Sequence, residues 1–161
     1  MPILLDDTAI QELISEEKVL RVRINVLMQL KTRSGHSGNE IELTGSKGNS
    51  FRLMLRRSNI NSMDFSVILG VYLVKTNELF RLRRYNGKSH VHGNRIEGNS
   101  FYDFHIHEAT ERYQVIGARE DTFAQVTNRY TDLLTATRCL LDDCNFSFPE
   151  KNQLNLFATN L

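Results

Sequence analysis

The stretch MDFSVILGVYLVK (residues 63–75) decides the fold of this chain. Apolar side chains fill both its odd and its even positions, which is the pattern of a strand whose two faces are both covered. Turn-forming residues bound the stretch, with SNINS before it (58–62) and TNE after it (76–78). We therefore predict a central strand at whose ends the chain reverses direction.

The segments on either side of this strand alternate between apolar and polar residues, as strands with one exposed face do. In SFRLMLRR, for example, Phe51, Leu53 and Leu55 share one face. Short Gly, Ser and Asn turns separate most of these segments, so we expect an antiparallel meander. The six predicted strands cover residues 19–31, 40–45, 50–57, 63–75, 79–85 and 101–108.

Two segments with helical periodicity flank the predicted strands. Residues 8–17 open with the spacing of a capping box at Thr8, and residues 121–143 carry apolar side chains at every third or fourth position behind a cap at Asp121 or Thr122. The pattern predicts an α+β fold, in which an N-terminal helix and a long C-terminal helix pack on an antiparallel sheet of about six strands.

The length of 161 residues suits a single domain over 1–161, with a core in 8–146 and a C-terminal extension at 147–161. No apolar run reaches the roughly 20 residues that a membrane span needs. The start, MPILLDD, lacks the basic leader of a signal peptide, so we expect a cytoplasmic protein without a membrane partner. Cys139 and Cys144 are expected to be reduced.

Charge is unevenly distributed along the chain. The net charge of +1 argues against a nucleic-acid-binding protein whose entire surface is basic. Between Arg52 and Lys88, however, eight basic residues accompany only two acidic ones, Asp64 and Glu78. This imbalance predicts a local basic patch.

Four of the five histidines fall within 18 residues, as two His-x-His pairs: His90 with His92, and His105 with His107. Side chains two apart on a strand point to the same side. If residues 101–108 form a strand, the apolar side chains must face the core and the polar ones an open face or cleft. The predicted core residues are Tyr102, Phe104 and Ile106, and the predicted polar ones are Asp103, His105 and His107.

Three interpretations of this cluster compete. Imidazoles with pKa values near 6.5 can act as acid and base, with Asp103 fixing a tautomer, and such a pair cleaves RNA when a cation stabilises the phosphorane. His-x-His on a strand can instead chelate a metal, together with His90 or His92 and Asp103. The histidines can also be ordinary polar residues on the exposed face of an edge strand.

We favour acid-base chemistry, without a metal or other cofactor, because no Glu or Cys ligand sits at matching spacing. The predicted cation is Arg81, Arg84 or Lys88, all close to the histidines in the sequence. The predicted catalytic residues are His92, His105 and His107. The predicted substrate-binding residues are Arg81, Arg84, Lys88, His90, Asn94 and Asp103.

Several segments resemble a family of small uncharacterised prokaryotic proteins with a His-x-Asn and His-x-His core: FRLMLRRSNIN, LFRLRRYNGKSHVHGN, FHIHE and LLDDCNF. The resemblance covers roughly residues 8–146 and places the two motifs on His92 with Asn94, and on His105 with His107. The stretch RYNGKSHVH is also similar to a segment of the TumE-like toxins of toxin-antitoxin systems, where Arg84, Tyr85 and His90 correspond.

The resemblance implies a toxin-like endoribonuclease, and the acid-base interpretation of its histidines adds that it would cleave phosphodiesters without a metal. RNA and a cognate antitoxin protein would then be its partners. Two alternatives remain open at this point. One is a non-enzymatic binding or regulatory protein of a phage-defence or mobile-element locus, and the other is a His-x-His metal-binding protein.

Overall fold

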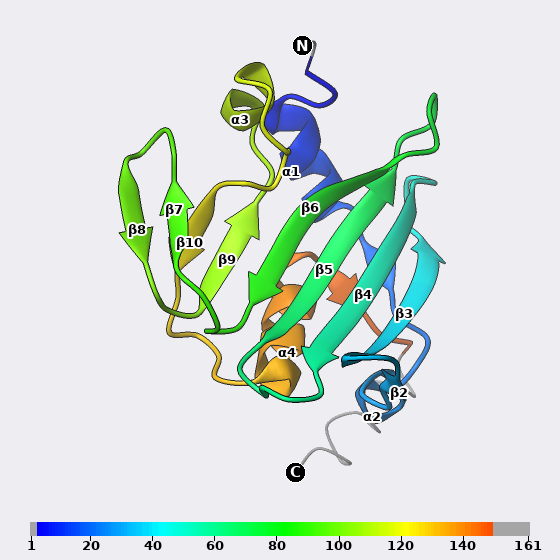
Figure 1. Cartoon of the computed structure of the whole chain (residues 1–161). Helices are drawn as coiled ribbons and strands as arrows, with labels where there is room; N and C mark the ends of the chain where they lie inside the picture. The colour runs from blue at the N-terminus through cyan, green and yellow to red at the C-terminus, as the bar shows by residue number, and fades with distance from the viewer. Residues whose placement is uncertain (1–2, 150–161) are drawn as a thin grey trace.

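The computed structural model describes residues 3–149 and contains a seven-stranded antiparallel sheet, with strand order β10-β9-β6-β5-β4-β3-β2 (Figure 1). The predicted central strand is β5, the fourth of the seven, and it pairs with its sequence neighbours on both sides. The strands are β2 (Lys31–Thr32), β3 (His36–Thr44), β4 (Ser50–Ser58), β5 (Phe65–Tyr72), β6 (Leu79–Asn86), β9 (His105–Glu108) and β10 (Ala124–Val126).

Four helices and two small two-stranded sheets complete the described part of the chain. Strand β1 (Lys18–Val19) pairs in parallel with β11 (Phe146–Ser147), and β7 (His92–Asn94) forms a hairpin with β8 (Asn99–Phe101). The α+β fold is therefore confirmed. The helices are α1 (Asp7–Ser15), α2 (Ile24–Leu27), α3 (Glu111–Val115) and α4 (Leu133–Asp143).

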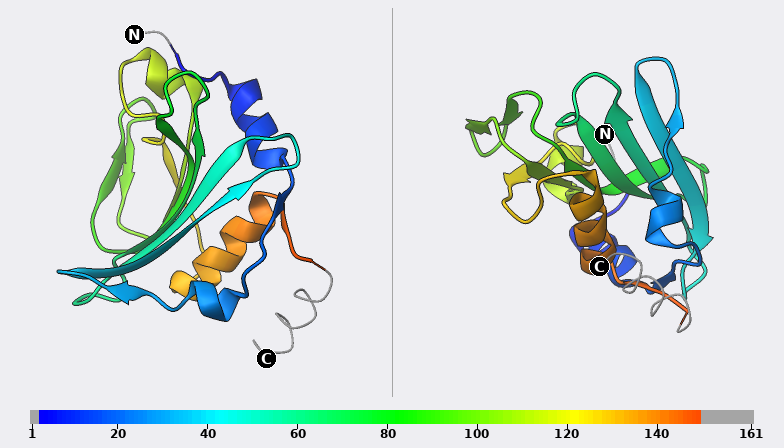
Figure 2. Two further views of the ribbon diagram at one scale, coloured as in Figure 1. Left: turned by 90° about the vertical axis from the view of Figure 1, so that its right-hand side faces the viewer. Right: turned by 90° about the horizontal axis from the view of Figure 1, so that it is seen from below.

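Both longer helices lie on the same face of the curved sheet, and the main core is between them and the strands (Figure 2). Helix α4 buries residues at the spacing of one helical face, including Leu133, Ala136 and Leu140. Each fully buried large apolar side chain contributes roughly 1.5–3 kcal/mol relative to leaving it in water. The strand residues of this core include Phe51, Leu53, Leu55, Val67, Leu69, Val71, Phe80, Leu82 and Ile106.

The opposite face of the sheet is less covered than the sequence of β5 indicates. Ser66, Ile68 and Tyr72 on this face of β5 are only half-buried. Apolar residues at both odd and even positions thus predicted correctly that β5 is central. They also predicted that both of its faces are buried, and the second face is only partly so.

The predicted long strand over residues 19–31 is wrong. Only Lys18–Val19 and Lys31–Thr32 are strand here, and Ile24–Leu27 forms a helical turn. The fully buried residues are Leu20, Ile24 and Leu27, at intervals of four and three, whereas Val26 is exposed. Burial therefore follows the helical period, and the alternation of apolar residues along the sequence is coincidental.

The predicted helix over residues 121–143 begins too early. Helix α4 starts at Leu133, behind a capping box in which Asp132 and Thr135 each bond the other's backbone N–H. Before α4, residues Ala124–Val126 form β10, which pairs with β9 and extends the sheet, so this part of the predicted helix is a strand. At the N-terminus the helix is close to the prediction, although its cap is Asp6 and not Thr8.

Other expectations concern smaller features. The loop that carries His90 and His92 contains the β7–β8 hairpin, and Phe101 belongs to β8 and not to the strand of His105. Cys139 and Cys144 are free thiols, as expected. None of the helices in the described part of the chain has the length and apolar character that crossing a membrane requires. Most of the proposed C-terminal extension lies outside the described residues.

Candidate metal centre

The predicted alternation of core-facing and opposite-facing side chains is confirmed for His105, Ile106 and His107 of β9. Ile106 joins the main core, opposite Tyr85 of β6, while His105 and His107 project to the other side of the sheet. The predicted exposure is wrong, because His105 is 0% and His107 4% exposed, whereas Tyr102 is 51% exposed. The cause is that β9 is an interior strand, with β10 beside it and hairpin residues over the histidines.

The β7–β8 hairpin brings a third imidazole to this face. The ring centroid of His92 lies 5.5 Å from that of His105 and 4.8 Å from that of His107. Phe101 of the same hairpin packs 5.5 Å from His105, and the exposed His90 lies 5.9 Å from it. The segment 90–94 therefore folds back onto the strand of His105 and His107.

Each imidazole of this trio has one nitrogen bonded to a carbonyl oxygen. His105 Nδ1 is 2.7 Å from the backbone oxygen of Asp103, and His107 Nδ1 is 2.8 Å from the backbone oxygen of Asp121. His92 Nε2 is 3.0 Å from the side-chain oxygen of Asn94. Carbonyl oxygens only accept, so these nitrogens carry hydrogens, and in the neutral rings the lone pairs lie on His92 Nδ1, His105 Nε2 and His107 Nε2.

Those lone pairs have few protein partners. His105 Nε2 is buried without any hydrogen-bond partner in the described residues. One ring nitrogen from each of His92, His105 and His107 lies within 4.8 Å of the other two, so all three lie within about 2.8 Å (4.8/√3) of a common point. A Zn–N bond measures roughly 2.0–2.1 Å, so inward movements of under about 1 Å would bring all three nitrogens to coordination distance.

Burial keeps the two strand histidines neutral. It lowers the pKa of His105 to about 4 and that of His107 to about 2, from an ordinary value near 6.5. Neutral imidazole is the form that ligates metals. The same burial makes these two residues poor general acids at neutral pH, because the protonated form is scarce.

Asp121 links the histidines to two arginines. Its fully buried carboxylate accepts from Arg84 Nε at 3.1 Å and from Arg119 Nε at 2.8 Å, while its backbone oxygen accepts from His107. Arg84 is also the β6 partner of His107 and shares its face of the sheet. The structure thus brings Arg84 to the histidines as predicted, and adds Arg119, which the sequence gave no signal for.

The other predicted site residues occupy different positions. Asp103 bonds the peptide N–H of Phe104 with its carboxylate and fixes the His105 tautomer through its backbone oxygen, not through the predicted carboxylate. The peptide N–H of Arg81 donates to Glu120 at 2.9 Å. Lys88 lies over the ring of Tyr102, with 5.7 Å between Nζ and the ring centroid.

Asn94 is buried behind His92 and uses both ends of its amide. Its oxygen accepts from His92 and from the peptide N–H of Ala124, and its nitrogen donates to the backbone oxygen of Ala124 at 2.7 Å and to Asn99 at 3.1 Å. This saturation makes Asn94 a positioning residue for His92 and leaves it no spare donor for a substrate.

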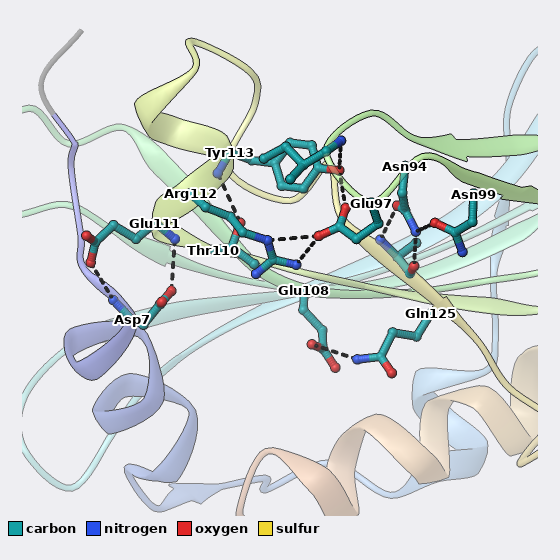
Figure 3. A network of polar contacts seen from close by, with 12 residues as sticks. Asp7, Asn94, Glu97, Asn99, Glu108, Thr110, Glu111, Arg112, Tyr113 and Gln125 are labelled. Carbon is teal, nitrogen blue, oxygen red and sulfur yellow. Dashed lines mark hydrogen bonds and ion pairs between the residues drawn. The ribbon is translucent and has the colours of Figure 1, made fainter.

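A polar network holds the hairpin on α3 and β10 (Figure 3). Glu97, in the turn between β7 and β8, accepts from Arg112 Nη2 at 2.6 Å and from the Tyr113 hydroxyl at 2.6 Å. The peptide N–H of Ile96 donates to the same hydroxyl. The hairpin that carries His92 is therefore attached at its turn as well as through Asn94.

Comparison of the chain with protein-family models, with curated proteins and with solved structures finds no match. The similarity to TumE-like toxins consequently stays a prediction. A fold by itself does not determine a function, so the chemistry of this protein is argued from the geometry of the three histidines and their neighbours.

Proposed function

We propose that the protein binds one divalent transition-metal ion through His92, His105 and His107. The observation that carries this proposal is the convergence of three imidazoles, each with one nitrogen bonded to a carbonyl oxygen. Such partners outside the coordination shell fix the tautomer and the orientation of metal-ligating histidines in known metal sites. The orphaned Nε2 of His105 supports it further, because a buried acceptor without a partner is costly unless something binds there.

Zinc is the metal that suits this set of ligands best. Three neutral imidazoles accommodate Zn²⁺, Cu²⁺, Ni²⁺ or Fe²⁺, and Zn²⁺ imposes no geometric preference of its own on a set of side chains. Three protein ligands also leave a fourth position for water or a substrate. A water in that position on Zn²⁺ has a pKa near 7, so the proposed activity is metal-assisted hydrolysis.

The test is metal binding by protein purified without a histidine tag. Elemental analysis should find about one equivalent of metal, and titration against a chromophoric chelator should give a single tight site. His105→Ala and His107→Ala should each lose this site, while His36→Ala, which removes a histidine on the distant strand β3, should keep it. Less than half an equivalent of metal, or unchanged binding in both variants, would contradict the proposal.

A thermal-stability measurement guards against misfolded variants. Metal at 100 times its dissociation constant should stabilise the wild type by about 2.7 kcal/mol through mass action. Folded His105→Ala and His107→Ala proteins, identified by cooperative unfolding, should show no such increase.

Metal-independent endoribonuclease activity is the second candidate, and the position of Arg84 beside His107 favours it. The guanidinium group can stabilise a phosphorane, but His92 or His90 would then have to supply the proton. Cleavage of RNA that persists in EDTA and is lost in His92→Ala would support this candidate. Cleavage that EDTA abolishes would instead support the metal centre.

A further inference from the structure

A metal ion bound by the three histidines would stand beside a group of positive charges. Arg84 shares the face of His107, and Arg119 reaches the same carboxylate of Asp121. Both guanidinium groups bond the one carboxylate, with Nε–O distances of 3.1 Å for Arg84 and 2.8 Å for Arg119, so the two cations lie close together. The single carboxylate of Asp121 neutralises only one of these two cations, so a second anion at this place would be attracted.

The two arginines have hydrogen-bonding groups to offer such an anion. Each uses its Nε to bond Asp121, and neither terminal amino nitrogen of Arg84 or of Arg119 has a hydrogen-bond partner among residues 3–149. The side chain of Arg84 is only 20% exposed, so its free donors are partly shielded from water. Guanidinium groups with free terminal donors bind oxyanions with two parallel hydrogen bonds.

We infer that Arg84 and Arg119 bind a phosphoryl oxyanion, which occupies the open position on the metal. The metal half of this inference rests on the proposed function, whereas the arginine half does not. The ligand class is therefore inorganic phosphate or a phosphate monoester.

The charges favour phosphate over a carboxylate. The metal and the two guanidinium groups carry four positive charges, and the carboxylate of Asp121 removes one. Arg81 and Glu120, whose carboxylate accepts from the Arg81 peptide N–H, carry opposite formal charges and leave this sum unchanged. A dianionic phosphoryl group neutralises two of the remaining three charges, whereas a carboxylate or a phosphodiester neutralises only one.

The experiment uses the full chain loaded with Co²⁺, whose visible absorption bands respond to a new ligand on the metal. Inorganic phosphate should change the spectrum with a saturable dissociation constant. Acetate and dimethyl phosphate, which stand for a carboxylate and for the diester of an RNA backbone, should bind at least tenfold more weakly. Equal binding of acetate or of dimethyl phosphate would overturn the choice of a dianion.

Variants of the arginines test their part directly. Arg119→Gln and Arg84→Gln should each weaken phosphate binding at least tenfold. Arg119→Gln is the safer variant, since that side chain is 51% exposed and its loss leaves Asp121 paired with Arg84. Arg56→Gln removes a similar half-exposed arginine, which lies on β4 and pairs with Asp64, and should leave phosphate binding unchanged. Unweakened binding in folded Arg119→Gln and Arg84→Gln would refute the inference.

Failure of this inference differs from failure of the metal site. If Co²⁺ binds and phosphate leaves its spectrum unchanged, the inference is wrong and the proposed function stands. If no metal binds, the proposed function is wrong, and dialysis of the metal-free protein against radiolabelled phosphate tests the arginines alone. If the metal-free protein retains phosphate and Arg119→Gln does not, the anion site of the arginines is supported. If the metal-free protein retains no phosphate, the anion site is refuted.

Discussion

Replacing Asn94 by alanine tests whether the hairpin positions the third histidine. Asn94 is only 3% exposed, and its amide makes four hydrogen bonds, two of them with the backbone of Ala124. Alanine leaves the N–H and the C=O of Ala124 without these partners in a site where Ala124 is 1% exposed. It also removes the acceptor that fixes the ring of His92.

The expected loss of stability follows from these contacts. An unsatisfied buried polar group costs about 1–3 kcal/mol, so the two groups of Ala124 should together lower the free energy of unfolding by about 3 kcal/mol. A domain of this size commonly has about 5–15 kcal/mol, so the variant should still fold. Loss of a residue that orients a metal ligand commonly weakens metal binding about 10–100-fold, and we expect a loss in that range here.

Urea unfolding and zinc titration measure the two effects on the same samples. Asn99→Ala is the matched control, because it removes only one bond of Asn94 at an exposed position and should cost under about 1 kcal/mol. Asn94→Asp keeps the acceptor for His92 but sets a carboxylate oxygen against the backbone oxygen of Ala124. It should lose stability and bind zinc better than Asn94→Ala. Equal zinc affinities for wild type and Asn94→Ala would refute the positioning role.

Further predictions concern the backbone and a buried lysine. Gly87→Ala should cost about 3 kcal/mol, because its Cβ would lie 1.9 Å from the backbone oxygen of Met63, whereas Gly93→Ala meets nothing within 4 Å and should be nearly neutral by the same urea assay. Lys18→Met should cost about 2 kcal/mol at pH 7, since Lys18 Nζ contacts four backbone oxygens. Burial lowers the pKa of Lys18 to about 8 from 10.5, so the unfolded chain binds more protons between these values. The stability of the wild type relative to Lys18→Met should therefore rise by about 2 kcal/mol from pH 8 to pH 10, and a flat difference would contradict the assigned shift.

The middle of the sheet could be predicted because its determinants are local. In β4, the alternation of Phe51, Leu53 and Leu55 coincides with burial, and short turns specify antiparallel neighbours. The segment around Ile24 shows the limit of this reasoning. Its apolar residues also alternate, but which of them are buried depends on contacts with distant elements, and those contacts favour a helical turn.

The candidate site was predictable to a similar degree. Two residues apart on one strand, His105 and His107 had to share a face, and proximity in sequence made His92 a reasonable neighbour. Their burial was not predictable, because it depends on a hairpin of three-residue strands rich in glycine and asparagine. The hydrogen bond between His107 and Asp121 could not be predicted either, because it uses a backbone oxygen, which every residue possesses.

The hydrogen-bond partners of the imidazoles help to distinguish acid-base catalysis from metal ligation, which the sequence alone could not do. An acid-base pair works best when a carboxylate stabilises the protonated ring, and the sequence offered Asp103 for that role. In the described residues, neither Asp103 nor Asp121 directs its carboxylate to a histidine. The carboxylate of Asp103 accepts from the peptide N–H of Phe104, and that of Asp121 bonds two arginines. Both instead present backbone oxygens, which fix a neutral tautomer and cannot exchange a proton with it. Neutral rings with fixed tautomers are what a metal ion requires, so the same three histidines fit ligation better than proton transfer.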